Sequence, residues 1–124
     1  MVTAHRVYQL YETAMNWSEA QAFCRQHEAD LATIDSPEDH IRLTESIGDA
    51  GVEVVWTGLT KSAADQWVWS EGIGVDKLYD YSPNKGDGDC VFMGPGGYWN
   101  VNECTTRKAY MCEECKLQSY SRSH

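Results

Sequence analysis

The chain has 124 residues, of which 42% are hydrophobic and 23% charged, so its composition fits one globular domain and excludes a disordered chain. Only ten residues are Lys or Arg and the formal net charge is −9, so no nucleic acid partner is expected, because phosphate contacts need clustered cations. No apolar run reaches the roughly 18 residues of a membrane span, and we therefore expect no membrane insertion by this chain.

Hydrophobic periodicity and end signals predict two helices and several strands in the first part of the chain. In chain order we expect a strand at 6–12, a helix at about 17–28, an extended link at 31–34, a helix capped by Ser36 and ended by Gly48, and strands at 54–59 and 67–69.

The start of the first helix carries a specific signal. Asn16 is expected to cap it, with Glu19 three residues later completing a capping box, and Cys24 is expected to face the core. The tripeptide Asn16-Trp17-Ser18 is also a glycosylation sequon. Capping and glycosylation could therefore compete for the same asparagine.

The 18 residues from Glu71 to Gly88 contain four glycines and predict a long loop, which in a compact domain is usually functional. Apolar runs at 91–93 and 109–111 follow, each beside a cysteine, and predict short antiparallel strands around a Gly/Pro turn. Residues 115–124 are polar and aperiodic, so a loosely held tail is expected there.

Five cysteines make an odd count: Cys24, Cys90, Cys104, Cys112 and Cys115. The last two have the C-x-x-C spacing of zinc and redox sites. A zinc site would need a second ligand pair, and the four histidines are scattered, while a redox motif would need a βαβ setting. Two disulfides and one leftover thiol are the favoured interpretation.

The order of several phrases along the chain resembles that of the C-type lectin-like domain. The matching phrases are Trp17-Ser18-Glu19-Ala20-Gln21-Ala22-Phe23-Cys24, Ala29-Asp30-Leu31-Ala32-Thr33-Ile34, Trp56-Thr57-Gly58-Leu59, Trp67-Val68-Trp69-Ser70-Glu71-Gly72, Asp89-Cys90-Val91, Trp99-Asn100 and Tyr110-Met111-Cys112-Glu113. The resemblance implies an α+β fold, with two helices flanking antiparallel sheets and a long irregular loop region. It covers a domain at 6–114, which leaves a polar C-terminal tail at 115–124.

The resemblance also implies which cysteines pair. Cys24 should bond Cys112, and Cys90 should bond Cys104, as in the short form of the family. Cys115 has no family partner, so it is either a free thiol or part of an interchain bond. A disulfide-linked or non-covalent homo-oligomer is accordingly among the expected partners.

Sugar-binding members of the family hold one calcium ion with side-chain oxygens at five positions, and this chain departs from the pattern. Asn84 and Asn100 match, whereas Ser82, Gly88 and Val101 replace the carboxylate-bearing ligands. Ca²⁺ takes about 6–8 oxygen ligands, so this incomplete set predicts weak or lost calcium binding and no required cofactor. The alternative is a rearranged calcium site built from Asn84, Asp87, Asp89 and Asn100.

The expected function is that of an extracellular, non-catalytic recognition module that binds a carbohydrate or glycoconjugate through the surface of residues 71–102. The expected ligand-binding residues are Tyr81, Ser82, Asn84, Asp87, Trp99 and Asn100. Tyr98 is a further surface candidate, while Trp99 belongs with the tryptophans expected in the core. Sequence alone leaves open whether Pro83 is cis.

Three alternatives remain beside the hypothesis of a carbohydrate-binding module with weak or lost calcium dependence. They are a protein-binding domain, a calcium-dependent lectin with the rearranged site, and an assembly unit. No enzyme is expected, because no serine lies in a G-x-S-x-G elbow and no carboxylate pair is indicated. The first six residues lack the apolar region of a signal peptide. Because disulfides form outside the cytosol, we expect a secreted or extracellular domain in mature form.

Overall fold

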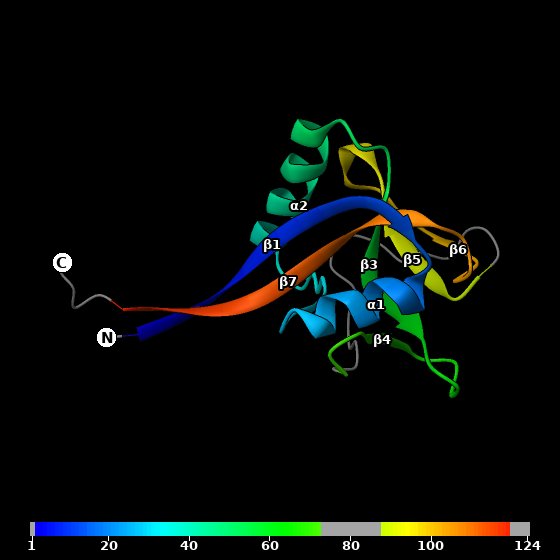
Figure 1. Ribbon diagram of the computed structural model, residues 1–124, viewed down its shortest axis with the longest axis horizontal. Coiled ribbons are helices and arrows are strands. Elements are labelled where there is room, and N and C mark those ends of the chain that lie inside the picture. Colours follow the sequence, from blue (N-terminus) through cyan, green and yellow to red (C-terminus); the bar gives the residue numbers. More distant parts are fainter. Residues whose placement is uncertain (1, 73–87, 120–124) are drawn as a thin grey trace.

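The computed structural model describes residues 2–72 and 88–119, with side chains for residues 6–72, 88–94 and 96–114. Two α-helices, one short 3₁₀ helix and seven strands follow one another in an α+β order (Figure 1). The elements are β1 (Val2–Met15), α1 (Trp17–Gln26), β2 (Asp30–Leu31), α2 (Pro37–Ala50), β3 (Val55–Lys61), β4 (Trp67–Trp69), β5 (Cys90–Met93), η1 (Pro95–Gly97), β6 (Trp99–Asn102) and β7 (Lys108–Ser119). Neither α-helix of these described segments is long and apolar enough to cross a membrane.

All seven strands belong to one sheet. Its main order is β1-β7-β3-β5-β6, with β2 also paired to β7 and β4 to β3. The pairs are antiparallel except for β3 and β7, which run parallel with Val55 opposite Ala109. The sheet is therefore mixed, and the expectation of purely antiparallel pairing is wrong for this one pair. Parallel pairing needs a long connection, which the chain between β3 and β7 provides.

The sheet separates two hydrophobic clusters, each covered by one helix (Figure 1). Leu43 and Ile47 of α2 are fully buried in the larger cluster, together with Trp69 and Trp99. Ala20 and Cys24 of α1 are fully buried in the second cluster. Burial on both faces explains why the central strands are apolar on both sides rather than alternating.

The caps predicted from the sequence are confirmed at both helix starts. The Asn16 side chain and Glu19 form the capping box of α1, and Ser36 caps α2. The predicted end of α2 at Gly48 is wrong, because the helix continues to Ala50 and ends at Gly51, whose φ is +72°. A helix tolerates an exposed glycine such as Gly48 at modest cost, whereas a left-handed cap favours glycine strongly.

Both implied disulfides are present, Cys24–Cys112 between α1 and β7 and Cys90–Cys104 beside the β5–β6 hairpin. Strand β7 continues through residue 119, paired with β1 from Val2 onward. Residues 115–119 are therefore paired backbone rather than the loosely held tail that was expected. This two-stranded ribbon projects away from the helices (Figure 1).

Gly58 lies where β3 passes directly against the chain after β2. A Cβ atom there would come within 2.9 Å of the carbonyl oxygens of Leu31 and Ala32. We expect Gly58→Ala to lower the free energy of unfolding by about 1–3 kcal/mol, because neighbouring backbone cannot move aside easily. The measurement is urea unfolding of the purified domain.

Gly48→Ala is the matched control. A Cβ at position 48 meets no atom within 4 Å, so alanine should raise the stability of α2 by up to about 1 kcal/mol. Equal losses of stability in the two variants would contradict the steric argument.

Candidate functional site

The segment expected to form a long functional loop, residues 71–88, is described only at its two ends, and the chain at its first end, which we call the loop root, is anchored to α1. Gln21 Nε2 donates to Ser70 Oγ at 2.9 Å, and Arg25 Nη2 donates to the Ser70 carbonyl at 2.7 Å. Ser70 Oγ in turn donates to the Asp30 carboxylate. These three contacts fix the direction in which the chain enters the loop. The loop residues expected to bind ligand, Tyr81, Ser82, Asn84 and Asp87, lie outside the described residues, as does Pro83.

A second anchor joins the loop root to β1 through Arg6. Its guanidinium lies 2.6 Å from Asp35, 2.8 Å from Asp39, 3.5 Å from Glu113 and 3.6 Å from Glu71. Four carboxylates, one each from α2, β7, the link before α2 and the loop root, thus share one cation. Such a network, part-buried and multiply hydrogen-bonded, holds its members more firmly than an isolated surface pair would.

Glu113 is the most deeply buried carboxylate of this network. Its side chain is 6% exposed, and burial raises its pKa to about 8, an effect that nearby Glu71 reinforces. The Thr33 N–H, which donates to Glu113 Oε1 at 2.5 Å, and the Arg6 charge act in the opposite direction. The pKa of Asp35 is shifted in the opposite direction, because the hydrogen bond that Asp35 accepts from Arg6 lowers it.

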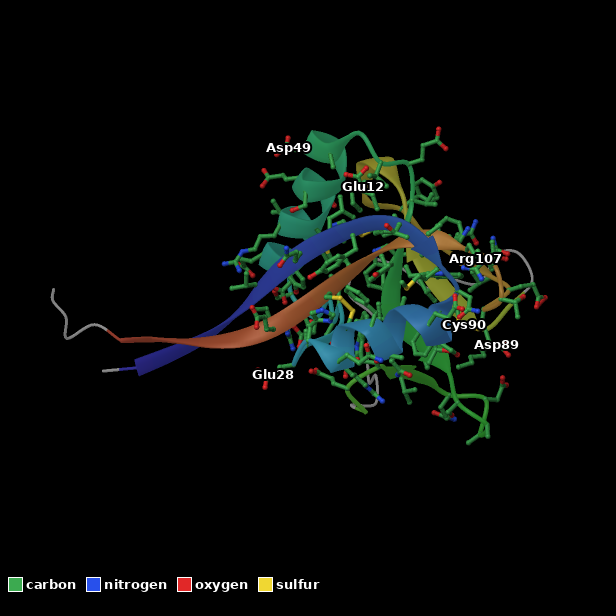
Figure 2. All side chains as sticks on the ribbon, in the orientation of Figure 1. Glu12, Glu28, Asp49, Asp89, Cys90 and Arg107 are labelled. Carbon is green, nitrogen blue, oxygen red and sulfur yellow. A yellow bond between two sulfur atoms is a disulfide. The ribbon has the colours of Figure 1, made fainter. Side chains whose placement is uncertain are left out.

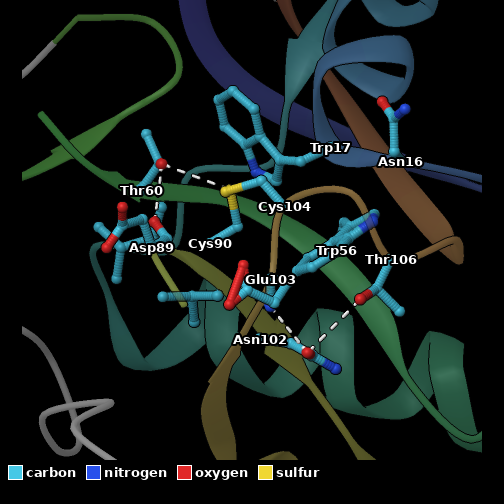
Figure 3. The surroundings of a disulfide bond; sticks show 12 residues. Asn16, Trp17, Trp56, Thr60, Asp89, Cys90, Asn102, Glu103, Cys104 and Thr106 are labelled. Atoms are coloured by element: carbon cyan, nitrogen blue, oxygen red, sulfur yellow. Dashed lines mark hydrogen bonds between the residues drawn. A yellow bond between two sulfur atoms is a disulfide. The ribbon is translucent and has the colours of Figure 1, made fainter. Parts of the chain in front are cut away.

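A second set of contacts fixes the chain at Gly88 and at the residues that follow it, of which Figure 3 shows Asp89 and Cys90. A Cβ at Gly88 would meet the carbonyl carbon and oxygen of Asn102, and φ at this glycine is +136°. The carbonyl of Asp89 accepts from the Lys61 N–H at 2.9 Å and from Thr60 Oγ1 at 2.8 Å. The Cys90–Cys104 disulfide follows at once, so both roots of the loop are held by the sheet or by α1.

Alternation along the β5–β6 hairpin decides which side chains reach the surface. Trp99 and Val101 point into the core, with exposed fractions of 2% and 8%. Trp99 packs edge-to-face on Trp69 there, so it is placed away from the surface on which ligand contact was expected. The opposite face of the hairpin carries Phe92 and Asn100, which are directly paired across the strands.

Four side chains on this outer face form what we call the hairpin patch: Phe92, Tyr98, Asn100 and Lys108. Tyr98 is 43% exposed, and its ring meets Phe92 edge-on at 6.3 Å. Lys108 Nζ lies 4.6 Å from the centre of the Phe92 ring and 5.3 Å from that of Trp56. The patch thus presents aromatic edges, an amide and a cation side by side.

Sequence reasoning missed Phe92 and Lys108 as members of this surface. The available signal was the two-residue period of a strand, which places Phe92 on the face opposite Val91 and Met93. Lys108 carries no such signal, since only the folded sheet brings it over two rings. Tyr98 and Asn100 were expected on the surface.

The described calcium positions do not fit a calcium ion held in the family manner. Gly88 offers no side chain and has no room for one, and Val101 is buried hydrocarbon. Asn100 Oδ1 accepts the N–H of Val101 at 2.9 Å. No group of three or more His, Cys, Asp or Glu side chains within the described segments is arranged to hold a metal. The rearranged set also needs Asn84 and Asp87, so it stays a prediction.

Asp89, the remaining member of that rearranged set, is exposed. It lies with Cys90 at the end of the molecule remote from the free ends of β1 and β7 (Figure 2). The hairpin patch and both loop roots belong to the compact body rather than to the projecting ribbon.

Comparison with known proteins gives consistent matches. A family model described as Lectin C-type domain matches residues 13–114. The chain is 32% identical over 118 residues to the C-type lectin domain family 2 member D-related protein of Rattus norvegicus, covering 94% of this chain and 46% of that protein. It is 29% identical over 112 residues to C-type lectin domain family 17, member A, of Homo sapiens, covering 87% and 29%. The chain spans less than half the length of these curated relatives.

Comparison with solved structures gives matches of similar fold over most of the chain. The chain is similar to a calcium-independent type II antifreeze protein, with a TM-score of 0.75, 26% identity and coverage of 91% of this chain and 90% of that one. It is also similar to the mouse scavenger receptor C-type lectin carbohydrate-recognition domain, with a TM-score of 0.76, 24% identity and coverage of 88% and 89%. At that lower identity the likeness is one of fold alone.

The raised pKa of Glu113 predicts a specific pH dependence of stability. An acid that binds its proton more tightly when folded destabilises the fold progressively as pH rises from its ordinary value of 4.5 to about 8. We expect the wild-type protein to lose more stability than Glu113→Gln between pH 5 and pH 8. Each unit of difference between the folded and unfolded pKa of Glu113 corresponds to about 1.4 kcal/mol in the free energy of unfolding.

The test compares denaturant midpoints of the two proteins across this pH range. All other acids are shared by the two proteins. The difference between their plots of denaturant midpoint against pH therefore reports the contribution of Glu113 alone. Parallel pH profiles would mean that Glu113 is already ionised beside Arg6.

Proposed function

The chain belongs to the C-type lectin domain family, and we propose that it is a non-catalytic recognition module that binds a carbohydrate or glycoconjugate through the hairpin patch and the adjoining loop. The observation that carries this proposal is the grouping of Phe92, Tyr98, Asn100 and Lys108 on one face of the hairpin. Aromatic rings pack against the apolar faces of sugars, while amide and ammonium groups meet sugar hydroxyls.

The chemistry of the patch suits this role without a metal. Asn100 uses Oδ1 for the Val101 N–H, and its amide N–H₂ has no partner among the described residues. Lys108 supplies three N–H donors, and burial against the rings lowers its pKa. Donors beside exposed aromatic carbon form a surface of mixed character that matches a sugar ring better than a purely polar surface would.

Calcium independence is the second part of the proposal. Its support is the glycine at position 88, whose close contact with Asn102 leaves no space for a carboxylate, together with the burial of Val101. One structure similar to this chain is described as calcium-independent, so the fold functions in that protein without the ion. We place the domain outside the cell, where two disulfides are stable.

A protein ligand is the second candidate, favoured by the 43% exposure of Tyr98, since tyrosines concentrate binding energy at protein interfaces. Both candidates use the same patch. A glycan screen separates them, because a protein-specific domain would bind no glycan on the array.

The calcium prediction is tested by melting the domain with increasing calcium and with EDTA. We expect the melting temperature and tryptophan fluorescence to be unchanged, because the described family positions, Gly88, Asn100 and Val101, supply one amide oxygen and no carboxylate. Saturable stabilisation by calcium at millimolar concentration or below would instead support the rearranged site.

The patch prediction is tested by binding to an array of neutral and acidic glycans. Tyr98→Ala and Asn100→Ala should each weaken binding about 5- to 10-fold, the effect of losing one ring contact or one hydrogen bond. Tyr98→Phe, which keeps the ring, should bind nearly as well as wild type.

Ile41→Ala is the control, because Ile41 is 55% exposed on α2 and lies outside the hairpin patch. Binding that survives both alanine changes in the patch would move the ligand to another surface.

A further inference from the structure

Asn16 stands in a position that serves two purposes at once. We propose that it is an acceptor for an N-linked glycan, attached through Nδ2, and that its Oδ1 continues to cap α1 after the attachment. The chain has four asparagines, and Asn16 alone is followed by Ser or Thr at the second position after it. This modification is separate from the ligand binding proposed above.

The cap and the modification use different atoms of Asn16. Its Oδ1 accepts the N–H of Glu19 at 2.8 Å, and its main-chain N–H donates to Glu19 Oε1 at 3.1 Å. Its carbonyl accepts the N–H of Ala20 at 2.9 Å. Nδ2 has no hydrogen-bond partner among the side chains and backbone that the structure describes. The expected competition between capping and glycosylation is therefore removed by geometry.

The two outer residues of the sequon face solvent while the middle one is fixed. Trp17 is 7% exposed, and its Nε1 donates to the carbonyl of Thr57 at 2.8 Å. Its main-chain N–H donates to the carbonyl of Cys104 at 3.0 Å. Ser18 is exposed and Asn16 is half-exposed, and the Asn16 amide points away from the Cys90–Cys104 disulfide (Figure 3). A glycan on Nδ2 would leave the surface without displacing any described contact.

The transfer step balances with a lipid-linked oligosaccharide pyrophosphate as donor. Nδ2 of Asn16 attacks C1 of the first sugar, so an N–C1 bond forms while the bond from C1 to the pyrophosphate oxygen breaks. The lipid pyrophosphate leaves with that electron pair, and Nδ2 loses one proton to a base of the transferase. The product is a secondary amide whose carbonyl oxygen is unchanged, so the hydrogen bond from the Glu19 N–H is retained.

The first experiment tests attachment. The full chain is secreted from mammalian cells behind a cleavable signal sequence, and the wild type is compared with Ser18→Ala and Ser18→Thr. Wild type and Ser18→Thr should lose the mass of one N-glycan on treatment with peptide N-glycosidase F, whereas Ser18→Ala should lose none. Absence of a glycan on the wild type, or a glycan that survives in Ser18→Ala, would overturn the proposal.

The second experiment tests the cap. Asn16→Asp removes the glycan but keeps an oxygen that can cap, so it should melt near unglycosylated Ser18→Ala. Asn16→Ala removes both the glycan and the capping oxygen, and it should melt about 3–6 °C below Ser18→Ala. The glycosylated wild type should melt no lower than Ser18→Ala. A glycosylated protein that melts as low as Asn16→Ala would show that attachment breaks the cap, contrary to the proposal.

Discussion

The pairing of β7 with three other strands is the constraint on which the rest of this fold depends. At Cys112, β7 lies opposite Gln9 of β1 on one side and Leu31 of β2 on the other, and the disulfide to Cys24 ties the same residue to α1. One residue later, Glu113 receives the Thr33 N–H and lies beside Arg6. Packing, covalent and electrostatic constraints thus converge within two residues of one strand. Helix α1 is tied to this crossing point by the disulfide, and α2 and the loop root are tied to it through Arg6.

The candidate site also depends on several contacts that hold a short piece of chain in place. Each root of the expected loop is held by contacts to residues that are themselves fixed in the sheet or in α1. The hairpin patch depends on core packing beneath it, because burial of Trp99 and Val101 forces Asn100 to face outward. Lys108 then covers the ring of buried Trp56, which joins the patch to the core on the α1 side. The hairpin patch and the core are consequently coupled through neighbouring residues on two short strands.

Local signals in the sequence predicted local structure well. The caps at Asn16 and Ser36 follow from side chains that bond backbone three residues away, so no tertiary information is needed. The disulfides followed from the family resemblance, because spacing leaves several pairings open. Sequence patterns were insufficient where tertiary structure decides: Trp99 was expected both among the ligand-binding residues and in the core, and strand pairing buries it, while residues 115–119 lack periodicity yet pair with β1. Lys108 reaches its two rings only because β7 lies beside β3, which no local pattern encodes.

The antiparallel arrangement of β1 and β7 has a mechanical consequence. The two strands run to the same end of the molecule, so a force pulling the chain ends apart would unzip their hydrogen bonds one pair after another (Figure 1). Separation of the strands, starting from Val2 and Ser119, would reach Cys112. There the disulfide to Cys24 connects the two ends of the chain covalently without passing through the residues between them. Tension would then run along the chain to Cys24, across the sulfur atoms and out through Cys112. Residues 25–111, which include the hairpin patch, would carry no load while that bond is intact.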